Sequence, residues 1–310
     1  MTNPLPQQPG KLGKYDIVEK IGEGGYSLVF RGFDPLIKRH VAIKSCSTTH
    51  RDIRERFYRE AEIAGHLDNP NIVRGYDLLN ENETTNLVQE LLEGEDLDDR
   101  IERREPDSFS ARLYFLIQIA RGLDYAHQRG VIHRDVKPAN VRVLEDGTVK
   151  ILDFGIAQLV NYTSDLTQQG MAVGTAAYLA PEQIRGERAS PATDIFAFGV
   201  LAYELLTYIR PFGRETISET FFQTLNHDPP PLTAHWTDCP AEVVDLVQRC
   251  LHKDPAARFA SCSDVRDHLE GVRDRLRDHW SPGADPARTR TLSTIPTSSA
   301  ESVTAEHALP

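Results

Sequence analysis

The sequence has few cysteines and no long apolar segment. Its longest apolar stretch runs from Ile195 to Tyr203, far short of the roughly 20 residues that span a bilayer, so no membrane segment is expected in this chain. No Cys-x-x-Cys pair occurs, which argues against a zinc site or a disulfide framework. We therefore predict reduced thiols in a cytosolic setting for Cys46, Cys239, Cys250 and Cys262.

The sequence also lacks an excess of positive charge. Its formal net charge is −11 at pH 7, whereas proteins that bind nucleic-acid backbones are usually basic, so a nucleic acid is not expected as a partner. Residues 1–14 form an N-terminal extension without a basic flank leading into an apolar run, so no signal peptide is predicted. We expect a cytoplasmic location, and a membrane segment beyond residue 310 stays compatible with it. The oligomeric state is left open.

Hydrophobic periodicity divides the chain into two regions. Residues 15–89 contain short β-type runs, interrupted by one helix from about 51 to 67 in which apolar residues recur every three or four positions. From residue 96 onward the pattern is helical, except that residues 141–152 form two apolar runs around Asp146-Gly147, a strong hairpin signal. We therefore predict an α+β chain with two lobes and a ligand cleft between them.

The expected domain boundaries follow from this division. The small β-rich lobe covers about 15–89, a hinge covers 90–95, and the larger helical lobe covers 96–272. Residues 273–310 are rich in Ser, Thr, Pro and Ala and are predicted to be a disordered tail.

A glycine cluster lies between the first two predicted strands, in the segment Gly22-Glu23-Gly24-Gly25-Tyr26-Ser27-Leu28-Val29. Glycines allow the backbone to fold closely over a ligand and to turn N–H groups toward phosphate oxygens. Ser27 replaces the last glycine of the pattern G-x-G-x-x-G. Taken alone, this segment fits an ordinary turn equally well.

Lys44 ends the apolar strand Val41-Ala42-Ile43. Such a lysine is often a surface residue with a buried stem, but it can also serve as a point charge for phosphate oxygens if a carboxylate holds it. Glu60, in the following helix, is the candidate carboxylate. The alternative for Glu60 is a solvated helix charge.

The segment from His133 to Asn140 carries the strongest chemical signal. Asp135 can accept the proton of a hydroxyl nucleophile, and Lys137 can neutralise charge on a transferred phosphoryl group. The amide oxygen of Asn140 suits a hard cation such as Mg²⁺. Asp153, in Asp153-Phe154-Gly155 directly after the predicted hairpin, supplies a second oxygen ligand.

Together these segments resemble the eukaryotic-type protein kinase family, and most of all its bacterial serine/threonine members. The resemblance covers about residues 15–269 in the family's order, and it includes two further segments, 174–182 and 194–199. It implies a bilobal kinase fold and transfer of the γ-phosphate of ATP to Ser or Thr hydroxyls of proteins, with autophosphorylation and with Mg²⁺, or alternatively Mn²⁺, as cofactor.

The resemblance also implies roles for individual residues. Asp135 is the catalytic base, Lys137 contacts the γ-phosphate, Lys44 contacts the α- and β-phosphates and pairs with Glu60, and the metal ligands are Asn140 and Asp153. The nucleotide-binding residues are Ile21, Gly22, Glu23, Gly24, Gly25, Tyr26, Ser27, Leu28, Val29, Ala42, Lys44, Glu90, Leu92, Asp96 and Arg142.

Two of these positions need comment. Asp96 matches the residue that reaches the ribose, and Arg142 stands where the family often has a leucine beneath the adenine ring. We expect the aliphatic stem of Arg142 to form that floor while its guanidinium reaches solvent. Structural roles are implied for Glu182, which pairs with Arg258, and for Asp194. Asp194 binds backbone N–H groups of residues 133–140, which we call the catalytic loop.

Specificity for serine and threonine is indicated by Lys137 and Thr175, because a hydroxyl at 175 can bond both Asp135 and Lys137. Arg134 precedes Asp135, and relatives with this arginine are often switched by phosphorylation of the loop that follows residue 155. A phosphate there adds about −1.5 to −2 charges. The candidate phosphorylation sites are Thr163, Ser164, Thr167 and Thr175.

Two other functions fit these residues less well. A pseudokinase binds partners without transferring phosphate, but such proteins typically lose residues equivalent to Lys44, Asp135 or Asp153, and all three are present. A small-molecule kinase can share the Asp and Asn–Asp chemistry, but it generally lacks the docking segment 174–182.

Overall fold

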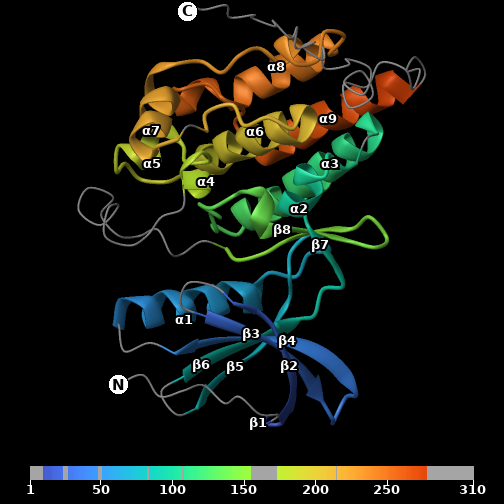
Figure 1. Ribbon diagram of the computed structural model, residues 1–310, viewed down its shortest axis with the longest axis vertical. Coiled ribbons are helices and arrows are strands. Elements are labelled where there is room, and N and C mark those ends of the chain that lie inside the picture. Colours follow the sequence, from blue (N-terminus) through green and yellow to red (C-terminus); the bar gives the residue numbers. More distant parts are fainter. Residues whose placement is uncertain are drawn as a thin grey trace, which may run out of the picture.

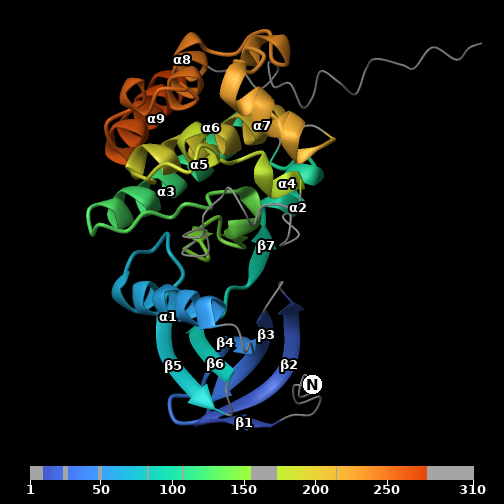
Figure 2. The same cartoon turned by 90° about the vertical axis from the view of Figure 1, so that its left-hand side faces the viewer.

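The chain folds into two lobes, seen one above the other in Figure 1. The structure is a computed structural model that describes residues 10–23, 27–47, 51–81, 84–106, 108–154, 173–213 and 215–277. The N-terminal lobe is built around a β-sheet, and the C-terminal lobe consists mainly of helices (Figures 1 and 2). The two-lobed α+β fold predicted from the sequence is confirmed.

The N-terminal lobe contains a six-stranded antiparallel sheet in the order β1-β2-β3-β4-β6-β5. Helix α1 (Arg51–His66) packs on β5 and β6, because its apolar face presents Phe57, Ala61 and Ala64 to buried side chains of the sheet. The strands are β1 (Lys11–Leu12), β2 (Tyr15–Glu23), β3 (Ser27–Asp34), β4 (Arg39–Ser47), β5 (Gly75–Glu81) and β6 (Thr84–Glu90).

The C-terminal lobe is organised around α6 (Pro191–Thr207), which is buried along nearly its whole length. Most of its side chains are apolar around the whole helix, as expected for one enclosed by other elements, and its buried polar residues are Thr193, Asp194, Glu204 and Thr207. It packs against α3 (Phe109–His127) and α8 (Ala241–Cys250). The remaining helices are α2 (Leu97–Glu102), α4 (Val173–Ala176), α5 (Pro181–Ile184), α7 (Ile217–Asn226) and α9 (Cys262–Arg277), with 3₁₀ turns η1 (Pro138–Asn140), η3 (Leu232–Ala234) and η4 (Pro255–Ala257).

A small antiparallel sheet lies where the two lobes meet. It consists of β7 (Gly94–Asp96), β8 (Val141–Leu144) and β9 (Val149–Ile151), in that order, and Figure 1 shows β7 and β8 between the lobes. Ile151 N donates to Asn71 O at 2.9 Å, and Val73 N donates to Ile151 O at 3.0 Å. These bonds tie the segment before β5 to the helical lobe.

The structure also bears on the cysteines, on membrane-spanning helices and on the C-terminal helix. All four cysteines are buried, and none of them forms a disulfide with another described residue. No helix within the described ranges has the length and apolar character needed to cross a membrane. Helix α9 continues to Arg277, five residues beyond 272, the predicted end of the domain, and its apolar stripe through Val265, Leu269 and Val272 packs in the core.

Candidate active site

The segment from His133 to Asn140 forms a tight loop held by its own polar groups. Asn140 Nδ2 donates to Asp135 O at 2.8 Å and to Asp135 Oδ2 at 2.9 Å. Lys137 Nζ lies 2.9 Å from the same Asp135 oxygen. The carboxylate of Asp135 is therefore fixed in position between a cation and an amide, with its side chain 23% exposed.

A buried carboxylate from α6 supports this loop. Asp194 Oδ2 accepts from His133 N at 2.8 Å and Asp194 Oδ1 accepts from Arg134 N at 2.7 Å, so the predicted contact with backbone N–H groups is present. His127 Nε2 lies 2.7 Å from Asp194 Oδ2. These bonds stabilise Arg134 at a φ of 67°, a left-handed conformation that non-glycine residues seldom adopt and that occurs most often at functional sites.

The end of β9 brings Asp153 to the catalytic loop. Leu152 N donates to Asn140 O at 2.8 Å, and His133 Nε2 contacts Leu152 O at 2.8 Å. The ring of Phe154 packs on His133 with centroids 4.7 Å apart. Asp153 also has a positive φ, 41°. Two strained residues, one on each segment, therefore lie beside the candidate catalytic groups.

Lys44 reaches across from the N-terminal lobe to Asp153. Lys44 Nζ lies 2.8 Å from Asp153 Oδ1, and the Lys44 side chain is only 13% exposed. Glu60, the predicted partner of Lys44, belongs to α1, but its side chain lies outside the described residues. The predicted Lys44–Glu60 pair therefore stays a prediction, whereas the Lys44–Asp153 contact was not expected from the sequence.

The glycine-rich segment ends next to Lys44. In the β2–β3 pairing Gly22 lies opposite Val29 and Glu23 opposite Leu28, and in the β3–β4 pairing Val29 lies opposite Lys44. Ile21 and Ser27 flank these residues, while Gly24, Gly25 and Tyr26 lie outside the described residues. The sheet thus places Gly22 and Val29, on the two strands of this hairpin, in line with Lys44.

The predicted hinge follows β6. Ala42 is buried and lies opposite Gln89, and Val41 lies opposite Glu90, so the sheet places the start of the hinge beside β4. Lys150 Nζ donates to Glu90 Oε2 at 2.8 Å. This contact was not expected from the sequence.

The expectation for the guanidinium of Arg142 is wrong. Its side chain is 31% exposed, but the guanidinium is not left to solvent, because it donates to Leu92 O at 3.2 Å, to Gly94 O at 2.7 Å and to Asp96 Oδ1 at 2.9 Å. The cause is the β7–β8 pairing, in which Asp96 lies opposite Arg142 and brings a carboxylate and two carbonyls within reach. Burial raises the pKa of the Asp96 carboxyl, and Arg142 opposes that rise.

The segment from Gly174 to Glu182 lies against the catalytic loop. Lys137 Nζ donates to Thr175 Oγ1 at 3.5 Å, and Gln183, in the helix α5 that ends this segment, donates to Arg134 O at 3.0 Å. The bonds of Lys137 and Gln183 join this segment to the residues on either side of Asp135.

The predicted Glu182–Arg258 pair is present and deeply buried. Arg258 NH1 donates to Glu182 Oε1 at 2.7 Å and Arg258 NH2 donates to Glu182 Oε2 at 2.9 Å, with side chains 3% exposed or less. Burial acts to raise the pKa of Glu182, but the hydrogen bonds and charge of Arg258 outweigh it, so the pKa lies below its usual value.

Of the four candidate phosphorylation sites, one belongs to the described residues. Thr163, Ser164 and Thr167 lie outside the described residues, whereas Thr175 is half-buried in α4.

Three supporting residues were missed by sequence reasoning: His127, Lys150 and Gln183. Their partners lie 49 to 67 residues away in the chain, so no local pattern in the sequence indicates them.

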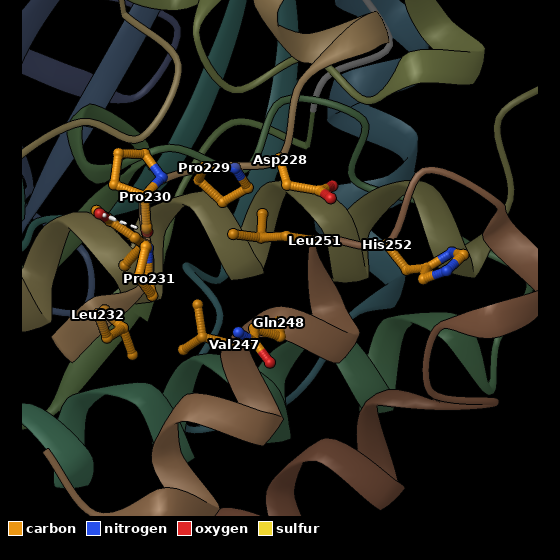
Figure 3. Close-up of a pocket in the computed structure, with 10 residues that line it drawn as sticks. Asp228, Pro229, Pro230, Pro231, Leu232, Val247, Gln248, Leu251 and His252 are labelled. Carbon is orange, nitrogen blue, oxygen red and sulfur yellow. Dashed lines mark hydrogen bonds between the residues drawn. The ribbon is translucent and has the colours of Figure 1, made fainter. Parts of the chain in front are cut away.

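A cavity of about 300 Å³ lies in the helical lobe, away from these residues. Figure 3 shows it between the proline-rich loop from Asp228 to Leu232 and the end of α8, with Val247, Gln248 and Leu251 on its wall. None of the predicted catalytic, metal-binding or nucleotide-binding residues lines it, so it is not the candidate active site.

The chain is similar to known protein kinases along most of its length. A family model described as the protein kinase domain matches residues 15–269. The serine/threonine-protein kinase PknA of Mycobacterium tuberculosis is 35% identical over 304 residues, covering 96% of this chain and 70% of PknA. PknL of the same species is 36% identical over 266 residues, covering 85% of this chain and 66% of PknL.

A Clostridium acetobutylicum protein, named a probable serine/threonine-protein kinase, is 33% identical over 286 residues. The match covers 90% of this chain but only 43% of that protein. The chain therefore spans less than half the length of this relative.

Proposed function

This chain belongs to the protein kinase family, and from that premise we propose that it transfers the γ-phosphate of ATP to serine and threonine hydroxyls of proteins. The observation that supports this proposal most is the cluster around Asp135. Its carboxylate is held by Lys137 and Asn140 at 2.9 Å each, and Lys137 also contacts Thr175.

In the proposed reaction Asp135 orients the substrate hydroxyl and accepts its proton. The hydroxyl oxygen forms a bond to the γ-phosphorus, the bond from that phosphorus to the β–γ bridging oxygen breaks, and ADP leaves. Lys137 stabilises the charge on the transferred group. Because Lys137 and Asn140 fix the carboxylate before substrate binds, little reorganisation is needed during the reaction.

Asn140 and Asp153 fit a divalent cation. Amide and carboxylate oxygens are hard ligands of the kind that Mg²⁺ prefers, and Asn140 uses its Nδ2 for Asp135, which leaves its amide oxygen for a cation. When bound, Mg²⁺ would neutralise charge on the phosphates. Mn²⁺ has similar ligand preferences and is the alternative.

The remaining nucleotide contacts are assigned from position. Lys44 would bind the α- and β-phosphates, with Glu60 as its second carboxylate partner besides Asp153. The hinge from Glu90 to Leu92 would face adenine, and the hairpin from Ile21 to Val29 would cover the phosphates.

Control by phosphorylation is the second part of the proposal. Arg134 Nε is buried and has no hydrogen-bond partner among the described residues, so a phosphate acceptor near it would satisfy a donor that is otherwise costly to bury. We assign this phosphate to Thr163, Ser164 or Thr167, with Thr175 as a further candidate. Autophosphorylation would then stabilise the docking segment 174–182 against the catalytic loop.

The test is incubation with labelled ATP and Mg²⁺, followed by mapping of phosphorylated residues in the chain and in an added protein substrate. Asp135→Asn is the matched inactive control. Label on serine or threonine, absent with the variant, supports the proposal. Absence of label with folded, metal-loaded protein, or label on tyrosine alone, contradicts it.

A Thr163/Ser164/Thr167 triple alanine variant tests the switch separately. If this variant phosphorylates an external peptide as fast as the parent, the proposed control by loop phosphorylation is wrong, whereas the transferase activity stands.

A further inference from the structure

Two basic side chains lie directly opposite each other on the β8–β9 hairpin and both bind the hinge. Arg142 of β8 pairs in register with Lys150 of β9. Lys150, 11% exposed at its side chain, binds Glu90 at the start of the hinge, and it contacts Ile72 O at 3.5 Å. Arg142 binds the other end of the hinge. The hinge is thus fastened at both ends by cations from one hairpin.

The partners of Arg142 account for most of its donor capacity. Its Nε, NH1 and NH2 each donate to a different acceptor: Leu92 O, Asp96 Oδ1 and Gly94 O. The two carbonyls fix the plane of the guanidinium, and this plane in turn holds Asp96. Moving Asp96 toward another ligand would break a charge-assisted bond between side chains that are only 31% and 38% exposed, and such bonds are about twice as strong as neutral ones.

We propose that Arg142, by pairing with Asp96, lowers the selectivity of this chain for nucleotides that carry ribose hydroxyls. The 2′- and 3′-hydroxyls of ATP then contribute little to binding. This inference rests on the proposed function and on the expectation, implied by the family resemblance, that Asp96 lies at the ribose of the bound nucleotide. A carboxylate already paired with a guanidinium is a weaker acceptor for a sugar hydroxyl than a carboxylate without such a partner. The chain therefore uses its acidic group at the sugar position to hold the hinge.

The experiment is equilibrium binding of ATP and of 2′,3′-dideoxy-ATP, each with Mg²⁺, measured by calorimetry at pH 8. The ratio of the two dissociation constants reports the contribution of the sugar hydroxyls, and it does not require phosphoryl transfer. For the parent protein we expect a ratio within about threefold, because neither hydroxyl gains a strong acceptor.

Arg142→Leu removes the guanidinium from Asp96. The ratio should then rise to about tenfold or more, because a hydrogen bond to a charged acceptor is worth at least that factor. In the double variant Arg142→Leu, Asp96→Asn the ratio should fall back toward the parent value. Lys150→Met is the matched control, since it removes the paired cation without touching Asp96, and it should leave the parent ratio unchanged.

The outcomes separate the inference from the proposed function. A parent ratio of tenfold or more overturns the inference even if no variant folds, and so does an unchanged ratio in a folded Arg142→Leu protein. A rise in the ratio for Lys150→Met equal to that for Arg142→Leu would show that general loosening of the hinge is responsible, which also overturns it. If the folded parent binds neither nucleotide, the proposed function itself fails and the inference falls with it.

Discussion

Asp194→Asn is expected to damage both stability and turnover. The two oxygens of Asp194 accept from His133 N, Arg134 N and His127 Nε2 at 2.7–2.8 Å, and the residue is fully buried. Asparagine offers one oxygen and one NH₂ group. Whichever way the amide is turned, at least one backbone N–H of the catalytic loop then faces another donor.

The size of the effect follows from these contacts. An orphaned buried donor costs about 1–3 kcal/mol, and loss of the negative charge weakens the remaining bonds, so the free energy of unfolding should fall by about 4 kcal/mol. For a domain of this size the melting temperature should fall by about 8–16 °C. Because Arg134 precedes Asp135, a shift of the loop by about 1 Å should lower kcat by roughly 100-fold.

The assay pairs urea unfolding with steady-state phosphorylation of a peptide. His127→Leu is the matched control, because it removes one donor to the same carboxylate and leaves both backbone bonds in place. It should cost about 2 kcal/mol of stability while kcat stays within about threefold. The reasoning is refuted if Asp194→Asn keeps kcat within threefold of the parent, or if His127→Leu lowers kcat as much as Asp194→Asn does.

Three further predictions concern single side chains. Asp135→Asn should fold normally and lose roughly 10²–10⁴ in kcat, and peptide phosphorylation within threefold of the parent would rule out its role as base. Arg258→Met leaves Glu182 buried without its partner and should cost about 3–5 kcal/mol in urea unfolding; a loss under about 1 kcal/mol would contradict this. Burial lowers the pKa of Lys253 to about 8 from 10.5, and its Nζ has no hydrogen-bond partner in the described part of the chain. Because the unfolded chain binds this proton more tightly, the penalty is full below pH 8 and disappears as the pH rises to 10.5. Lys253→Met should therefore melt at a higher temperature than the parent at pH 7, and the difference should vanish near pH 10.5; a constant difference across this range would refute the assignment.

Much of the candidate site could be predicted from the sequence, because its chemical groups lie in short contiguous segments. Asp135, Lys137 and Asn140 lie within six consecutive residues, so a single loop has to bring them together. The two lobes could also be predicted, since strand and helix periodicities divide the chain near residue 96. The extent of α9 was less predictable, because the helix continues to Arg277 beyond Val272, the last of its residues in the core cluster.

Arg142 shows where sequence reasoning reaches its limit. The sequence singled out Arg142 as the residue expected beneath the nucleotide, which stays a prediction, but it did not indicate the acceptors that its guanidinium binds. A long side chain has many rotamers of similar energy, and the choice among them depends on acceptors that come from residues 92–96, about 50 positions away. Only the pairing of β7 with β8 brings those acceptors into reach.

The sequence by itself determined the family, the order of the motifs and the identity of the groups that can move a proton, bind a phosphate or hold a cation. These depend on residue type and on spacing within a few residues. The tertiary structure alone decided which long-range partners those groups have: Asp153 for Lys44, Glu90 for Lys150 and Asp96 for Arg142. The physical reason is that a side chain's charge is set by its chemistry, whereas its partner is set by strands and helices that pack from distant parts of the chain.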